Sequence, residues 1–95
     1  MQSNKEPIKI YFDTIENFEP FVSLEIRAIE VVDNQCEWRS FDDPRVQFYG
    51  IYGHGKRKEA MCIADCLTLE TAQNLARTFN IFAMYTLTTF EHPKQ

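Results

Sequence analysis

The chain has 95 residues, which fits one domain around one hydrophobic core and excludes a second catalytic domain. Hydrophobic residues make up 44% and charged residues 25%, with 3 Gly and 4 Pro, so the composition excludes a disordered, collagen-like or low-complexity chain. The net charge of −4 argues against broad binding to the phosphate backbone of nucleic acids.

The ends of the chain are polar, and residues 1–6 and 92–95 are predicted to be flexible. No apolar run approaches the roughly 20 residues of a membrane-spanning helix, and the start lacks the pattern of a signal peptide. Three cysteines cannot all pair within one chain, so we expect reduced thiols and a cytoplasmic location. These are Cys36, Cys62 and Cys66.

The first predicted element is a short strand over 8–12, where side chains alternate with the period of 2 of a half-buried strand. Residues 13–20 are expected to form a loop or a single helical turn, because Pro20 would break a helix that ran through it. The stretch 21–32 fits a long strand or a helix opened by Pro20. Its five β-branched residues favour the strand, and the helix stays as the alternative.

The clearest pattern lies in the middle of the chain. Asp33 and Asn34 supply turn chemistry, and 36–45 is expected to form a loop with one edge strand at most. Over 45–66, two apolar runs flank a polar loop that contains glycine, which predicts a β-hairpin. Both arms carry apolar side chains on both faces. We therefore expect central strands, with a helix on one side and another surface, such as a second subunit, on the other.

The last third of the chain predicts an amphipathic helix over 68–80. Thr68 is a suitable N-cap, Glu70 lies in the first turn, and apolar residues recur at helical spacing. Asn80 is expected to end the helix, and the run 81–90 to form the last strand. The predicted fold is α+β: an antiparallel sheet of four to five strands with one helix packed on one face.

A basic hairpin loop over 53–58 is the first candidate site. Two glycines flank a histidine and three bases follow, so backbone donors and cations could hold a phosphate or an acidic protein surface. The pattern lacks the spacing of a Walker A loop. The candidate residues for binding an anion or a partner are Arg45, His54, Lys56, Arg57 and Lys58.

Charge and aromatic residues give two further candidate surfaces. Residues 1–43 hold ten acids and four bases, whereas 44–95 hold four acids and six bases, so the chain is polarised. The candidates for an acidic face that binds a partner are Glu16, Glu19, Asp42 and Asp43. The candidates for an exposed aromatic interface are Tyr49, Tyr52 and Trp38, although aromatics at strand spacing are most often core residues.

The residues give little support to a metal or catalytic site. Cys62 and Cys66 form a C-x-x-x-C pair, but an extended chain would place them on one face about 13 Å apart, beyond the reach of one metal ion or a disulfide. Thiol catalysis would require one of them to meet His54 and Asp65, and no family spacing supports that. We expect no metal and no cofactor.

The sequence therefore favours a small cytoplasmic module that binds another protein, or a second copy of itself as a homodimer, without catalytic activity. One helix covers only part of such a sheet, and the acidic half suits a basic partner. The alternative is a module that binds an anion or a nucleic acid through the loop 53–58, and the third hypothesis is a small enzyme around His54. Nucleic acid and membrane are the disfavoured partners.

Overall fold

The computed structural model describes residues 7–17, 21–56, 60–82 and 89–91. The predicted flexible ends, 1–6 and 92–95, lie outside these ranges. In chain order the elements are β1 (Ile8–Ile10), α1 (Phe12–Asn17), β2 (Ser23–Val32), β3 (Gln35–Arg39), β4 (Phe48–His54), β5 (Ala60–Cys66), α2 (Leu69–Phe82) and β6 (Thr89–Glu91). The predicted α+β class with an antiparallel sheet is confirmed.

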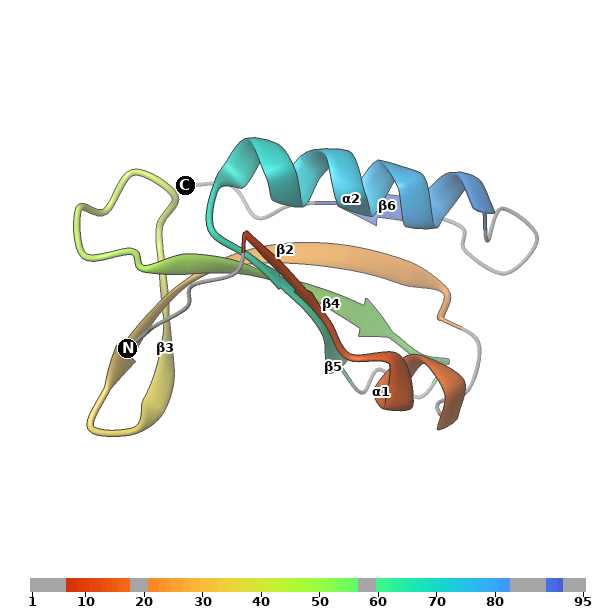
Figure 1. The fold of residues 1–95 in the computed structure, drawn as a ribbon, viewed down its shortest axis with the longest axis horizontal. Helices are drawn as coiled ribbons and strands as arrows, with labels where there is room; N and C mark the ends of the chain where they lie inside the picture. Colours follow the sequence, from red (N-terminus) through yellow and green to blue (C-terminus); the bar gives the residue numbers. More distant parts are fainter. Residues whose placement is uncertain (1–6, 18–20, 57–59, 83–88, 92–95) are drawn as a thin grey trace.

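The sheet has five antiparallel strands in the order β1-β5-β4-β2-β3. The short strand β6 pairs in parallel with the start of β2. Figure 1 shows α2 lying along one side of the sheet, whereas α1 and the β2–β3 hairpin project toward the other side. The described part of the chain thus holds two helices: α2, and the short α1, which lies where the sequence allowed a single helical turn.

β2 is the strand that the sequence favoured over a helix. Its residues Leu24, Ile26 and Ala28 are fully buried on the side of α2, which is the alternation that a strand in a layered fold requires. The turn after it is also confirmed, because Asp33 and Asn34 have φ angles of 52° and 66°. Positive φ at both central residues is what a two-residue hairpin turn of type I′ needs.

The predicted central hairpin is confirmed as β4 and β5, but a bulge interrupts it. The register shifts between Ile51 and Tyr52, whose partners are Ala64 and Cys62, so Ile63 has no partner of its own. Beyond the bulge the side chains of β5 change face. The prediction that Cys62 and Cys66 share a face is therefore wrong: Cys66 belongs to the core, whereas Cys62 lies on the opposite face.

α2 begins as predicted and ends later. The Thr68 hydroxyl accepts a hydrogen bond from the Thr71 N–H at 3.1 Å, and Ala72 and Ala76 are fully buried against the sheet. The helix continues past Asn80 to Phe82, because asparagine only weakly disfavours a helix and no glycine or proline follows it there. Of the strand predicted over 81–90, residues 81–82 belong to α2 and 89–90 to β6, whereas 83–88 lie outside the described residues.

The start of the chain also differs from the prediction. β1 ends at Ile10, and Phe12, expected at the end of this strand, is the first residue of α1. The Tyr11 N–H donates to the Ile63 carbonyl at 2.9 Å, and the Tyr11 carbonyl accepts from Ile15 at 3.2 Å. Tyr11 is thus the joint between strand and helix. Within the described ranges, neither helix has the length and apolar character to span a bilayer.

Candidate functional site

The sheet presents two chemically different faces. α2 covers one face, and the core there includes Leu24, Ile26, Ile51, Ala64, Cys66, Ala72 and Ala76. We call the opposite surface the open face. Strand register assigns to it Glu25, Arg27, Ile29, Val31, Cys36, Trp38, Phe48, Gly50, Tyr52, His54, Cys62 and Asp65. Polar and apolar side chains are mixed on this face.

Gly50 forms the floor of the open face. A Cβ at this position would lie 2.9 Å from the Tyr52 ring, 3.0 Å from the terminal methyl of Ile29 and 3.4 Å from the Asp65 carboxylate. Three side chains from three strands therefore converge over a backbone that carries no side chain. The φ of Gly50 is negative, so backbone conformation does not require a glycine here. The close approach of the three side chains does require it.

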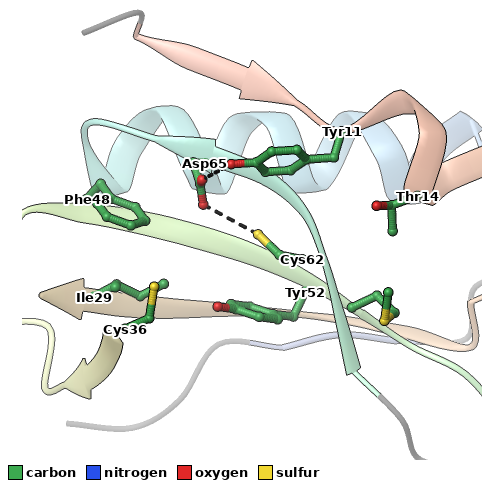
Figure 2. Close-up of a pocket in the computed structure, with 9 residues that line it drawn as sticks. Tyr11, Thr14, Ile29, Cys36, Phe48, Tyr52, Cys62 and Asp65 are labelled. Carbon is green, nitrogen blue, oxygen red and sulfur yellow. Dashed lines mark hydrogen bonds between the residues drawn. The ribbon is translucent and has the colours of Figure 1, made fainter. Parts of the chain in front are cut away.

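A cavity of about 320 Å³ opens above this floor. Figure 2 shows that Tyr11 and Thr14 from the β1–α1 segment lie on one side of it, with Ile29, Cys36 and Tyr52 on the other. Phe48, Met61, Cys62 and Asp65 complete the lining. The cavity thus lies between α1 and the β2–β3 hairpin.

Asp65 is the only carboxylate among the described residues that line this cavity. Its Oδ2 accepts a short hydrogen bond from the Tyr11 hydroxyl, and its Oδ1 accepts one from the Cys62 thiol at 3.4 Å (Figure 2). Both donors are neutral groups, so these bonds orient the carboxylate and leave its negative charge in place.

The neighbouring groups are held in their protonated forms. Burial, followed by the negative charge of Asp65, raises the pKa of the Cys62 thiol to about 12. Burial raises the pKa of Tyr52 to about 12, and burial together with the hydrogen bond to Asp65 raises that of Tyr11. At neutral pH Cys62 is therefore a thiol, which is a poor nucleophile. Protonation therefore disfavours Cys62 as a nucleophile.

A row of stacked and paired side chains follows the cavity toward the end of β4. The Arg27 guanidinium lies over the Trp38 ring at 4.0 Å from its centroid, and the Trp38 ring meets Tyr52 edge to face at 5.9 Å. Glu25 accepts from Arg27 at 2.6 Å and contacts His54 Nε2 at 2.8 Å. Each charged group in this row already has a partner.

The predicted basic site is divided by the fold. His54 is engaged by Glu25, and Lys56 lies beside it at a second hollow of about 550 Å³. Arg57 and Lys58 lie outside the described residues. Arg45 precedes β4 whereas His54 ends it, so the two are separated by roughly 20 Å of extended strand. The structure does not bring Arg45 to the hairpin loop.

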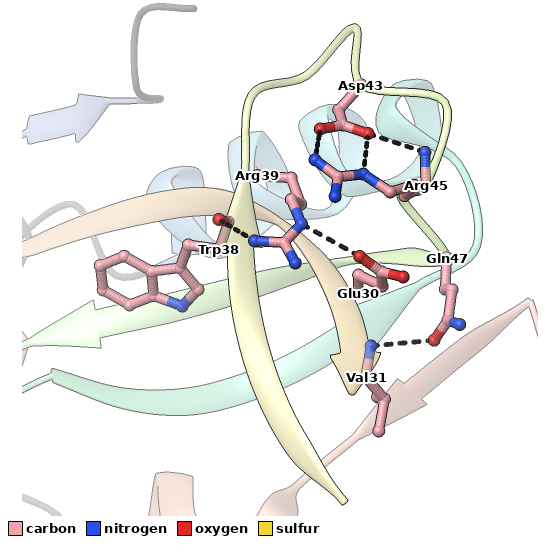
Figure 3. Close-up of polar contacts among 7 residues, drawn as sticks. All are labelled: Glu30, Val31, Trp38, Arg39, Asp43, Arg45 and Gln47. Carbon is pink, nitrogen blue, oxygen red and sulfur yellow. Dashed lines mark hydrogen bonds and ion pairs between the residues drawn. The ribbon is translucent and has the colours of Figure 1, made fainter. Parts of the chain in front are cut away.

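Arg45 instead forms a closed pair with Asp43. Its backbone N–H, Nε and Nη2 donate to the two carboxylate oxygens at 2.8, 3.1 and 2.8 Å (Figure 3). This hydrogen bonding lowers the pKa of Asp43 to about 2. In the same region Arg39 binds Glu30 at 3.0 Å, so two basic side chains are neutralised near the base of the β2–β3 hairpin.

The predicted acidic and aromatic candidates are also distributed over several elements. Asp42 and Asp43 lie in the loop before β4, and Glu16 lies in α1, with its side chain outside the described part. Glu19 lies outside the described residues. The aromatic candidates divide by face: Trp38 and Tyr52 meet on the open face, whereas Tyr49 packs against the core and Phe41 on the other.

Sequence reasoning missed Tyr11, Asp65 and Gly50 as parts of one site. The available signal was a glycine between aromatic residues in a central strand, since such a glycine marks a close approach to the backbone. It also missed that Glu25 pairs with His54.

Two further findings complete the description of the site. Among the described residues, no group of three potential metal ligands comes together. Comparisons with protein-family models, curated proteins and solved structures found no match for this chain.

Proposed function

We propose that this protein is a binding module that docks another protein on the open face of its sheet. The observation that carries the proposal is the exposed apolar rim around the cavity. Trp38 is 49% exposed, and Val31 and Met61 are each 40% exposed. Trp38 and Val31 project from the same side of the β2–β3 hairpin. Tryptophan, methionine and arginine are enriched where proteins meet.

The charge pattern of the open face supports a protein partner over a polyanion. The basic side chains at its centre and end are both engaged, because Arg27 contacts Glu25 and Trp38, and His54 contacts Glu25. A phosphate backbone would have to compete with Glu25 for them. A protein surface with apolar and basic side chains matches the rim and the Asp65 carboxylate together. We also propose the cytoplasmic location that the sequence predicts.

Neighbouring residues of β2 provide a matched test. Val31 points to the open face and is 40% exposed, whereas Val32 points to the other face and is 37% exposed. Wild type, Val31→Lys and Val32→Lys are each used as bait in an extract of the native host, with mass spectrometry of the bound proteins. We expect a specific partner that Val32→Lys retains and Val31→Lys loses by about tenfold or more.

Either of two results would contradict the proposal: both variants retain the same partners, or wild type captures no more than a blank matrix. Light scattering of the purified protein then distinguishes a second copy of this chain from a different protein as the partner. A dimer that Val31→Lys converts to monomer identifies the partner as a second copy of this chain, and a monomer in wild type identifies it as a different protein.

A further inference from the structure

The cavity on the open face has a chemical preference that the rim does not share. Its described walls are the rings of Tyr11, Phe48 and Tyr52 with aliphatic and sulfur groups, and they carry one carboxylate, Asp65. A carboxylate surrounded by aromatic faces is complementary to an organic cation, because both the negative charge and the ring quadrupoles attract it.

Within the described part of the chain, no ion pair matches the charge of Asp65. The ion pairs among the described residues join Arg27 and His54 to Glu25, Arg39 to Glu30 and Arg45 to Asp43, and none includes Asp65. The residue opposite it in the register is Lys9, whose ammonium lies over the Tyr11 ring at 5.4 Å from the centroid. Tyr11 and Cys62 hold the carboxylate in one orientation but do not neutralise it.

The size of the cavity limits the ligand to one side chain or a small fragment. At about 320 Å³ it lies at the lower end of ligand pockets, and it would hold roughly ten water molecules. An extended peptide is larger than this. A single long side chain can enter it while the rest of a partner stays outside on the rim.

A guanidinium suits these walls better than an ammonium. It is planar and weakly hydrated, so it loses less solvation in an apolar cavity and stacks on aromatic rings. The open face already contains one such contact, the Arg27 guanidinium over Trp38. A guanidinium also donates several parallel hydrogen bonds, which fits the acceptor sites that Tyr11 and Cys62 leave on Asp65.

We infer that this cavity receives one arginine side chain of the docked protein, with its guanidinium on the Asp65 carboxylate and its stem between Tyr52 and Tyr11. The inference rests on the proposed function, because it names the side chain by which the partner is recognised. The rim residues Trp38 and Val31 would then surround this central contact and exclude water from it.

The inference can be tested on the isolated protein with blocked amino acids. N-acetyl-arginine methylamide and N-acetyl-citrulline methylamide have side chains of nearly the same shape, and only the arginine is charged. Each is titrated into ¹⁵N-labelled protein, and amide shifts are followed by NMR. We expect arginine to shift the amides around Asp65 and Gly50 and to bind about tenfold more tightly than citrulline.

Two variants with the same loss of charge separate the cavity from general electrostatics. Asp65→Asn keeps the shape of the side chain and is expected to abolish the preference for arginine over citrulline. Glu70→Gln removes an exposed carboxylate from the first turn of α2, across the sheet from the open face, and is expected to leave that preference unchanged. The preference of the wild-type protein remains measurable even if Asp65→Asn fails to fold.

The outcomes also separate this inference from the proposed function. Equal shifts with both compounds, shifts elsewhere on the protein, or an unchanged preference in Asp65→Asn would overturn the arginine site. A difference between Val31→Lys and Val32→Lys in the capture experiment would then still support docking on the open face. Butylguanidinium forms a third titration, and binding as tight as that of the blocked arginine would show that the cavity recognises the cation alone.

Discussion

At the scale of single residues, the absence of a side chain at Gly50 shapes the open face. The backbone there lies under Tyr52, Ile29 and Asp65, which belong to three different strands. A methyl group at this position would displace at least one of them, because 2.9 Å is shorter than a carbon–carbon contact allows. The site thus depends on a residue without a side chain, and a pattern of chemically reactive residues in the sequence does not reveal it.

The pair of Asp43 and Arg45 gives a prediction about pH. Hydrogen bonds from Arg45 hold the pKa of Asp43 at about 2, below its ordinary value of 3.8. A depressed carboxyl pKa stabilises the fold above the ordinary value, and this stabilisation is lost as the pH falls through about 2. In Arg45→Gln we expect the pKa of Asp43 to return toward 3.8, as measured by ¹³C NMR titration of the carboxyl carbons.

The control for this titration is Arg77→Gln on α2, whose guanidinium donates to Asn74 instead. It should leave the Asp43 titration as in wild type. An Asp43 carboxyl that titrates alike in wild type and in Arg45→Gln would show that the pair does not persist in solution. The sequence places these two residues in two different candidate sites, and only the structure shows that they pair with each other.

At the scale of elements, the sequence predicted what depends on local chemistry. β2, the type I′ turn, the central hairpin and the start of α2 follow from β-branched content, positive-φ residues, alternation and the Thr68 cap. The bulge at Ile63 did not follow, because alternation continues through it in the sequence while the register shifts in space. That one residue moved Cys62 to the open face.

The turn between β2 and β3 carries a prediction about stability. Asn34 has a φ of 66°, a conformation that asparagine tolerates and alanine does not. Asn34→Ala should lower the free energy of unfolding by about 1 kcal/mol, whereas Asn34→Gly should equal or exceed wild type. Urea denaturation followed by circular dichroism measures both changes. An alanine variant as stable as wild type would be evidence against the left-handed conformation at this turn.

The turn matters for the site because β3 carries two residues of the open face. Cys36 lines the cavity, and Trp38 contacts Tyr52 and Arg27. Gln47 supports the same hairpin by accepting a hydrogen bond from the Val31 N–H at 3.0 Å (Figure 3). A weaker turn should therefore loosen the rim before it affects the core under α2.

At the scale of the whole molecule, the two faces of the sheet are unequal. One face is sealed by the alanines of α2, and the other is partly covered by α1 and the β2–β3 hairpin, with a cavity between them (Figure 1). The sequence predicted that one helix would leave a face uncovered, but it did not reveal how far the chain would curl over that face. Strand curvature and α1 depend on contacts between distant residues, such as Tyr11 with Asp65 and Ile63.

The same long-range dependence explains which candidate residues the sequence could identify. Trp38 and Tyr52 were named because their residue type alone suggests an interface. The sequence offers Asp65 only as a partner for a thiol nucleophile. Its hydrogen bond from Tyr11 depends on the pairing of β1 with β5. The sequence groups Arg45 with His54 because both are basic. Their residue type gives no information about the distance that β4 places between them.

The central claim is that the open face is covered when the protein is bound to its partner, and the alkylation of Cys36 tests it most directly. Cys36 is exposed and lines the cavity, whereas burial raises the pKa of Cys62 to about 12 and that of Cys66 to about 11. In the free protein we expect iodoacetamide to modify Cys36 first at neutral pH. In the complex recovered by capture, the account predicts that this reaction slows by about tenfold or more, as measured by mass spectrometry of the peptide. Modification of Cys36 at the same rate in the free protein and in the complex would contradict it.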